Sequence, residues 1–383
     1  MLTLKQTPHK TTSKFVNSAL DTFEYYGFES ATNTPKPKQR LSRARDLSYV
    51  LPHEKSLLDI TKTCLENNAH LSKAPKLIYK INKPKKDDTS SSIALHVMGS
   101  QSTAAEILIL STINTLLRKL QIQNAVVHIN SIGDKDSKSK FLRELNSYMR
   151  NVSSDLPPYA KRDLERKSPL LALVHLSEKN HPLIRTAPSP MEHLNDESRM
   201  RLRKILEYME NADMDYELNP TLVGSTDVWS HTIFEVRVPQ DEGYITIIRG
   251  GRHNDIARRG FNRTLASVSA IIEHELHGEY TEKPRKQKTP KFFISYLGEL
   301  ARIETFKLIE QLHDQNIQVG KTIAYHHIGD QIKDSDKYNP PYLLIIGHKE
   351  AVEKTVIVRN TTTRSQKVIP VSKVVSYISR LKV

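Results

Sequence analysis

Two short segments carry most of the residue types that could do chemistry. The first, 219–235, reads Asn-Pro-Thr-Leu-Val-Gly-Ser-Thr-Asp-Val-Trp-Ser-His-Thr-Ile-Phe-Glu, and the second, 249–255, reads Arg-Gly-Gly-Arg-His-Asn-Asp. Alternating residues over 232–238, a turn at 240–243 and a return over 244–248 predict a β-hairpin linking them. A Gly-Gly pair after a strand predicts a bend or a close approach of the backbone. From the residues alone, a buried hairpin and a pocket wall are equally good interpretations.

Other arrangements that could support catalysis are weaker. His253 with Asp255, and the pair at 326–327 with Asp330, are candidate metal or acid–base sites, but sixteen histidines in 383 residues produce such pairs by chance. The sequence has no phosphate-binding loop, dinucleotide-binding glycine motif, nucleophile elbow or paired-cysteine site. We therefore expect no metal site.

The charge balance is the strongest clue from composition. A formal net charge of +14 and a pI near 9.5 favour a polyanionic partner, above all nucleic acid, although solubility or a basic proteome would also explain them.

With 383 residues, 38% of them hydrophobic, the chain can form two or three domains. A single cysteine, Cys64, excludes an internal disulfide. Without a signal-like start or an apolar run of about 18 residues, we expect a cytoplasmic protein that does not span a membrane.

Hydrophobic periodicity predicts the elements that position these segments. Helices are expected over 12–27, from 103 to 120, after Asp134 and through Leu202 to Met209, and a helix or a strand followed by a helix is expected over 262–278. After a polar linker, strands alternate with helices, which predicts an α/β sandwich with a mostly parallel sheet. The expected strands there are 291–296, 317–324, 342–346 and 355–359, and the expected helices are 299–316, one near Gln331, and 371–381.

The sequence of residues 219–255 resembles that of histidyl-tRNA synthetases, where N-P-x-L-V-R-G-L-D-Y-Y-x-x-T-V-F-E precedes a G-G-R-Y-D turn. In that family both segments line the histidine and adenylate pocket. The matching residues are Asn219, Pro220, Leu222, Val223, Asp227, Thr232, Phe234, Glu235, Gly250, Gly251 and Arg252. The family's catalytic arginine falls on Gly224, its paired tyrosines on Val228 and Trp229, and the tyrosine of the second turn on His253. The resemblance implies a retained scaffold with altered chemistry.

Three further stretches resemble the motifs of class II synthetases. Residues 23–35 resemble motif 1, which implies a homodimer. Residues 79–99 resemble motif 2 but have no arginine, and the expected carboxylate falls on His96. Over 262–278, which resembles motif 3, the arginine that holds the γ-phosphate falls on Glu275, whose charge would repel a triphosphate.

The resemblance extends over nearly the whole chain and implies a fold. We expect an α+β class II synthetase core over 1–278, in which helices flank an antiparallel sheet, with a helical insertion at about 155–215. A linker over 279–290 would lead to an α/β anticodon-binding-type domain over 291–383.

The leading functional hypothesis is a pseudo-synthetase that binds tRNA or another structured RNA and needs no cofactor. One alternative is an active histidine–tRNA ligase using ATP and Mg²⁺. Another is a regulatory subunit that binds a protein partner, although the known synthetase-like regulatory subunit normally lacks the C-terminal domain. The expected degenerate pocket comprises His96, Gly224, Asp227, Trp229, Gly250, Gly251, Arg252, His253 and Glu275. The expected RNA contacts are Lys36, Lys38, Arg40, Lys83, Lys85, Lys86, Arg258, Arg259, Gln331 and Arg359.

Overall fold

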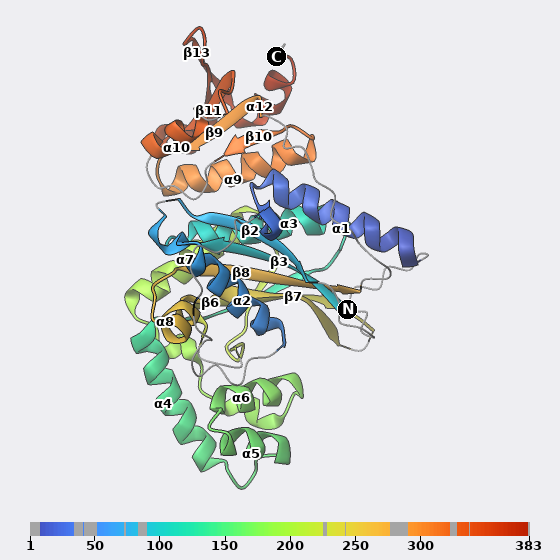
Figure 1. Cartoon of the computed structure of the whole chain (residues 1–383), viewed down its shortest axis with the longest axis vertical. Helices are drawn as coiled ribbons and strands as arrows, with labels where there is room; N and C mark the ends of the chain where they lie inside the picture. Colours follow the sequence, from blue (N-terminus) through green and yellow to red (C-terminus); the bar gives the residue numbers. More distant parts are fainter. Residues whose placement is uncertain are drawn as a thin grey trace. The chain divides into compact units, whose positions relative to one another are not determined.

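The computed structural model forms two compact units (Figure 1). The first, called the sheet unit, contains Ser30–Ile109 and Gln123–Leu276. The second, called the C-terminal unit, contains Gln6–Glu29, Leu110–Ile122 and the chain from His277 onward. The structure describes residues 8–33, 41, 52–72, 74–82, 90–224, 228–241, 243–275, 290–321, 328–336 and 338–381.

The sheet unit is built on an eight-stranded sheet. Its strands, in order across the sheet, are β1 (Glu29–Ser30), β2 (Lys76–Asn82), β3 (Ser90–Met98), β8 (Ser267–Glu275), β7 (Tyr244–Arg252), β6 (Ser230–Pro239), β4 (Val126–Gly133) and β5 (Tyr216–Leu218). Neighbouring strands from β2 to β4 run antiparallel, and β5 pairs in parallel with β4. The predicted hairpin is confirmed as β6 and β7.

Alternation along β6 divides its residues between the two faces of the sheet, as predicted. Phe234 and Val236 are fully buried on one face, whereas Glu235 and Arg237 are half-buried on the other. In the register of the hairpin, Glu235 lies opposite Arg249 of β7. The polar face of the hairpin therefore presents charged groups on neighbouring strands.

Helices cover both faces of this sheet. On the charged face, α2 (Pro52–Glu66) and α8 (Asn254–Phe261) contribute Leu57 and Ile256 to one apolar cluster with the sheet residues Ala94 and Ile271. The sequence analysis had predicted neither helix. On the other face, α3 (Ala104–Lys119) approaches β7 through an ion pair between Glu106 and Arg252.

The helices that follow β4 form a second apolar core. They are α4 (Lys135–Asn151), α5 (Pro158–Glu165), α6 (Pro169–Glu178) and α7 (Asp196–Asn211), of which the last three lie in the segment predicted as the insertion. Phe141 and Met149 of α4 pack with Leu173 and Leu176 of α6. The carboxylate of Asp134 caps α4 by accepting from the Ser137 amide at 2.9 Å.

The C-terminal unit contains a five-stranded sheet flanked by helices. Its sheet order is β10 (Val319–Lys321), β9 (Phe292–Tyr296), β11 (Tyr342–Ile346), β12 (Thr355–Asn360) and β13 (Gln366–Pro370). β10, β9 and β11 pair in parallel, but β12 pairs antiparallel with both β11 and β13, so the predicted mostly parallel sheet is wrong for the pairings of β12. A turn at 361–365 joins β12 to β13, and the residues of β13 are too exposed to give an apolar alternation. The helices are α9 (Glu299–Asp314), α10 (Ile328–Ser335), α11 (His348–Glu353) and α12 (Val371–Ile378).

The second half of α3 is buried on two sides. Its apolar residues Ile113, Leu116 and Leu117 are buried, and a polar stripe on the same helix contacts α9 and the residue that follows α1 (Pro8–Tyr25). The buried carboxylate of Glu310 in α9 accepts from Ser111 Oγ at 2.7 Å and from Asn114 Nδ2 at 3.3 Å. The hydroxyl of Tyr26 lies 3.0 Å from Ser111 Oγ and 2.8 Å from Thr115 Oγ1. These bonds explain why α1 and part of α3 group with the C-terminal domain.

Candidate functional site

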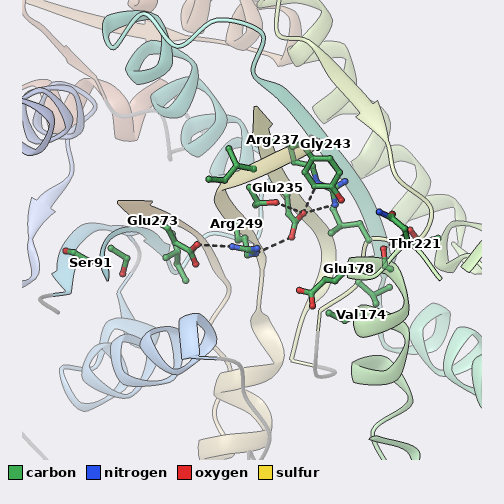
Figure 2. Close-up of a pocket in the computed structure, with 18 of the residues that line it drawn as sticks. Ser91, Val174, Glu178, Thr221, Glu235, Arg237, Gly243, Arg249 and Glu273 are labelled. Carbon is green, nitrogen blue, oxygen red and sulfur yellow. Dashed lines mark hydrogen bonds and ion pairs between the residues drawn. The ribbon is translucent and has the colours of Figure 1, made fainter. Parts of the chain in front are cut away.

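A pocket of about 790 Å³ lies on the charged face of the sheet, within the sheet unit (Figure 2). Residues of β6, β7 and β8 form its floor, and the end of α6 and the segment after β5 contribute its wall. Figure 2 shows Glu178 and Thr221 on that wall and Ser91 across the pocket. The lining is mainly polar.

An alternating row of charges crosses the floor of the pocket, as Figure 2 shows. Arg249 donates from Nη1 to Glu273 Oε2 at 3.0 Å, and its Nε lies 3.3 Å from Glu235 Oε1. The other oxygen of Glu235 accepts two bonds from Arg237, at 2.8 and 3.0 Å. Each guanidinium of the floor is therefore paired with a carboxylate.

Trp229 fills the space beside Gly224. The indole is 3% exposed and packs in the apolar cluster with Leu222 and Ile233. A Cβ atom placed on Gly224 would lie 1.9 Å from Trp229 Cδ1, closer than any real Cβ contact. The buried ammonium of Lys138 donates to the Trp229 carbonyl at 3.0 Å and also pairs with Asp255, which fixes the backbone beneath the ring. This position of the chain cannot hold a side chain while the ring remains there.

Two buried histidines share one hydroxyl deeper on the same face. His96 Nδ1 and His253 Nε2 each lie 2.7 Å from Ser269 Oγ, and all three residues are fully buried. Burial lowers the pKa of His96 well below its ordinary value, with His253 and Lys80 adding to the effect. Burial and the neighbouring Arg252 lower the pKa of His253 to about 3. Both imidazoles are thus neutral at pH 7, and His253 lies edge-to-face with Trp229 at 6.2 Å.

None of the predicted pocket residues whose side chains the structure describes lines the 790 Å³ pocket, and those of β7 serve packing. A Cβ on Gly250 would lie 2.5 Å from Phe234 Cζ, and Gly251 has φ +152° with the Thr232 carbonyl 2.5 Å from its would-be Cβ. The predicted close approach of the backbone is therefore made to neighbouring strands. Arg252, fully buried, binds both carboxylate oxygens of Glu106 at 2.7 and 2.6 Å.

That ion pair stabilises the face of the sheet away from the pocket. Arg252 also donates to the carbonyls of Ser100 and Ser102, at 2.9 and 3.0 Å. Burial raises the pKa of Glu106, but Arg252 overcomes this effect and holds that pKa below its ordinary value. The expectation that Arg252 lines the pocket is therefore wrong, because its guanidinium pairs with Glu106 on the opposite face of the sheet.

Comparison with known proteins finds a domain match and relatives that cover most of the chain. The anticodon binding domain family matches residues 291–381. Histidine–tRNA ligase 1 of Shouchella clausii is 26% identical over 291 residues, which cover 74% of this chain and 68% of that protein. The histidine–tRNA ligase of Rippkaea orientalis is 25% identical over 292 residues, covering 76% and 68%. Over about three quarters of its length the chain is similar to histidine–tRNA ligases.

A solved synthetase of the family shares the fold. Apo histidyl-tRNA synthetase of S. aureus aligns with a TM-score of 0.52 at 18% identity, over 99% of this chain and 100% of that one. The predicted fold class is confirmed: a class II synthetase core is followed by an anticodon-binding domain. In the described part of the chain, no helix is long and apolar enough to cross a membrane.

Several residues that the synthetase motifs single out lie outside the described ranges, so their roles stay predictions. Glu275 is the last residue of β8, where its backbone pairs with Ser90, but its side chain is not described. The predicted site residues outside the described ranges are Lys36, Lys38, Arg40, Lys83, Lys85, Lys86 and Asp227, together with the histidine pair at 326–327.

The other expected RNA contacts of this synthetase relative differ in accessibility. Arg258 and Arg259 are exposed on α8, although Arg258 Nη2 lies 3.0 Å from Asp255 Oδ1. Arg359 is half-buried in β12. Gln331 is fully buried, and its amide accepts from the Tyr296 N–H at 2.9 Å and donates to the Tyr296 carbonyl at 3.1 Å. Gln331 therefore joins α10 to β9, and its amide is closed to RNA.

One group of metal-ligand side chains occurs among the described residues. Glu144, Glu192 and His193 bring one potential ligand atom each to within 4.8 Å of one another. Both glutamates are exposed, and His193 Nε2 already lies 2.7 Å from Glu144 Oε2. An ion pair is enough to explain this cluster.

Motif matching to the synthetases missed two features. Arg249 and Glu273 line the pocket, but their meeting depends on the pairing of β7 with β8, which the local sequence does not reveal. The chain after Glu353 contains no Asp or Glu, and a charge count along the sequence would have found it. The cations of that segment within the described residues are Lys354, Arg359, Arg364, Lys367, Lys373 and Arg380.

Proposed function

We propose that this chain is a member of the histidyl-tRNA synthetase family that binds tRNA or another structured RNA and does not form an aminoacyl adenylate. The observation that carries the proposal is the contact between Trp229 and Gly224. In the family motif a catalytic arginine stands at the position of Gly224. Here the indole occupies the volume that any side chain at this position would need.

The charges of the pocket also disfavour adenylate chemistry. A triphosphate and the adenylate that follows it need cations that are free to bind phosphate oxygens. Arg237 and Arg249 each already bind a carboxylate, and Glu273 adds negative charge to the floor. ATP would have to displace these carboxylates from the guanidinium groups. The proposal therefore includes no ATP and no Mg²⁺.

Binding of RNA is supported by the C-terminal domain and its charge. The anticodon binding domain match spans 291–381, and the part of it after Glu353 carries cations without any acidic residue. Arg364, Lys367 and Lys373 are exposed on or beside β13 and α12. Closely spaced cations bind phosphate and release counterions, which makes affinity depend on salt. We place the main RNA contact on this basic segment, defined as residues 354–381.

Assembly as a homodimer is part of the proposal and rests on the motif 1 resemblance over 23–35. Light scattering coupled to size-exclusion chromatography is expected to give twice the chain mass of 43.8 kDa. A mass of one chain would remove the dimer from the proposal without affecting the other parts.

Two assays test the function. Histidine-dependent exchange of pyrophosphate into ATP is expected to stay at background, with an active histidine–tRNA ligase as positive control. Titration of labelled tRNA is expected to give an affinity that falls steeply with salt. Exchange above background would make the chain an active ligase. Absent RNA affinity, or affinity that ignores salt, would favour a regulatory subunit that binds a protein.

A further inference from the structure

The wall of the pocket carries a carboxylate without a partner. Glu178 is the last residue of α6, lines the pocket and is exposed, and it forms no hydrogen bond or ion pair with other described residues. The adjacent Lys179 does not neutralise it, because its ammonium lies over the ring of Tyr159, 4.1 Å from the centroid. The C-terminal end of a helix carries partial negative charge, which adds to the attraction for a cation.

Two hydroxyl groups line the pocket together with this carboxylate. Ser177 Oγ and Thr221 Oγ1 lie 3.4 Å apart, and both residues line the pocket together with Glu178. Figure 2 shows Glu178 and Thr221 on the same side of the pocket. A ligand whose charged end pairs with Glu178 would reach these hydroxyls with an adjacent donor or acceptor.

The net charge of the lining favours a cation. Among the described lining residues the three carboxylates of Glu178, Glu235 and Glu273 outnumber the two guanidiniums of Arg237 and Arg249, which leaves one negative charge. The chain as a whole carries +14. A small cation is therefore repelled by most of the surface and attracted only locally, which makes its binding a specific signal.

We propose that this pocket binds a small organic amine whose cation pairs with Glu178 and whose neighbouring polar group binds Ser177 and Thr221. The inference rests on the proposed loss of adenylate chemistry, because it assigns the same cleft to a ligand of opposite charge. The paired arginines of the floor would remain bound to Glu235 and Glu273 and would shape the pocket without contacting an anion.

Isothermal titration calorimetry of the full chain, without RNA, tests the inference with agmatine and spermidine as cationic probes and ATP as the anionic probe. We expect saturable binding of at least one amine and no heat from ATP. The isosteric variant Glu178→Gln is expected to weaken amine binding at least tenfold. The matched control is Glu165→Gln, an exposed glutamate at the end of α5 outside the pocket, and it is expected to leave binding unchanged.

The outcomes separate this inference from the proposed function. If neither amine binds, if Glu178→Gln binds as well as the native chain, or if ATP binds and displaces the amine, the pocket assignment is overturned. Absence of amine binding together with background pyrophosphate exchange would leave the proposed function standing. Exchange above background would overturn the proposed function, whatever the amines do.

Discussion

Replacing Arg364, Lys367 and Lys373 by alanine is expected to weaken RNA binding and to reduce its salt dependence. All three are exposed, and they lie in the basic segment that contains no acidic residue. Lys367 lies in the register of β13 opposite Val358, and its ammonium is 6.0 Å from the ring of Tyr377 in α12, so these cations belong to adjoining elements.

The expected size of the effect follows from counterion release. Each phosphate contact contributes roughly 0.7 to 0.9 to the slope of log K against log salt, so losing three contacts lowers the slope by about 2 to 3. At a salt concentration of about 0.1 M, one contact corresponds to about a sixfold change in affinity, and three to about 200-fold. If water mediates some of these phosphate contacts, both the change in slope and the fold-change in affinity would be smaller.

Fluorescence anisotropy of labelled tRNA across about 50 to 200 mM salt measures both quantities. The control variant replaces Lys291, Lys333 and Lys349 by alanine. These lysines are also exposed in the anticodon-binding domain, and replacing them removes the same number of positive charges. Its slope is expected to stay close to that of the native chain. An equal loss of slope in the two triple variants would show that net charge, and not the basic segment, drives binding. An unchanged slope in the first variant would refute the assignment.

Three further predictions concern the core. In urea unfolding, Trp229→Ala is expected to cost about 3–5 kcal/mol, and Gly224→Arg is expected to cost less in that background than in the native chain; strictly additive losses would contradict the clash. Arg252→Ala leaves the buried carboxylate of Glu106 with only the longer contact to Arg201 Nη2, at 3.4 Å, and is expected to cost about 3 kcal/mol; a native free energy of unfolding would disprove that role. Because the folded pKa of His253, about 3, lies below its ordinary value, the unfolded chain binds the proton first, and stability falls as pH drops below about 6.5. Between pH 7.5 and about 5.5 this contributes about 1.4 kcal/mol, a loss that His253→Gln should lack.

Local patterns were sufficient to predict much of the fold. The β6–β7 hairpin follows from alternation and a turn, and α4 follows from the spacing of Phe141, Leu145 and Met149, because both signals lie within one element. By contrast, β13 gives no such signal, since its residues are almost all exposed. β13 was missed for that reason, whereas β12 was predicted as a strand and only its antiparallel direction was not, because the local sequence does not specify strand direction.

The candidate site was harder to predict because a sequence motif does not specify which face of the sheet a side chain lies on. Arg252 follows two glycines that were expected at the pocket, yet alternation sends its side chain to the opposite face, toward Glu106. Arg249 lies two residues before Gly251, so the same alternation turns its side chain toward the pocket. The pairing that brings Arg249 to Glu273 joins strands far apart in sequence. The contact of Trp229 with Gly224 likewise depends on tertiary packing, which residue types alone do not specify.

The polar stripe of α3 limits how this protein can be divided by engineering. Glu310 of α9 relies on Ser111 and Asn114, and Tyr26, which directly follows α1, relies on Ser111 and Thr115, so these hydrogen bonds join three stretches of chain that are distant in sequence. A graft of residues 291–381 onto another scaffold would bring a buried carboxylate and leave its donors behind. A functional exchange of this domain between relatives would have to carry α1 and the second half of α3 with it.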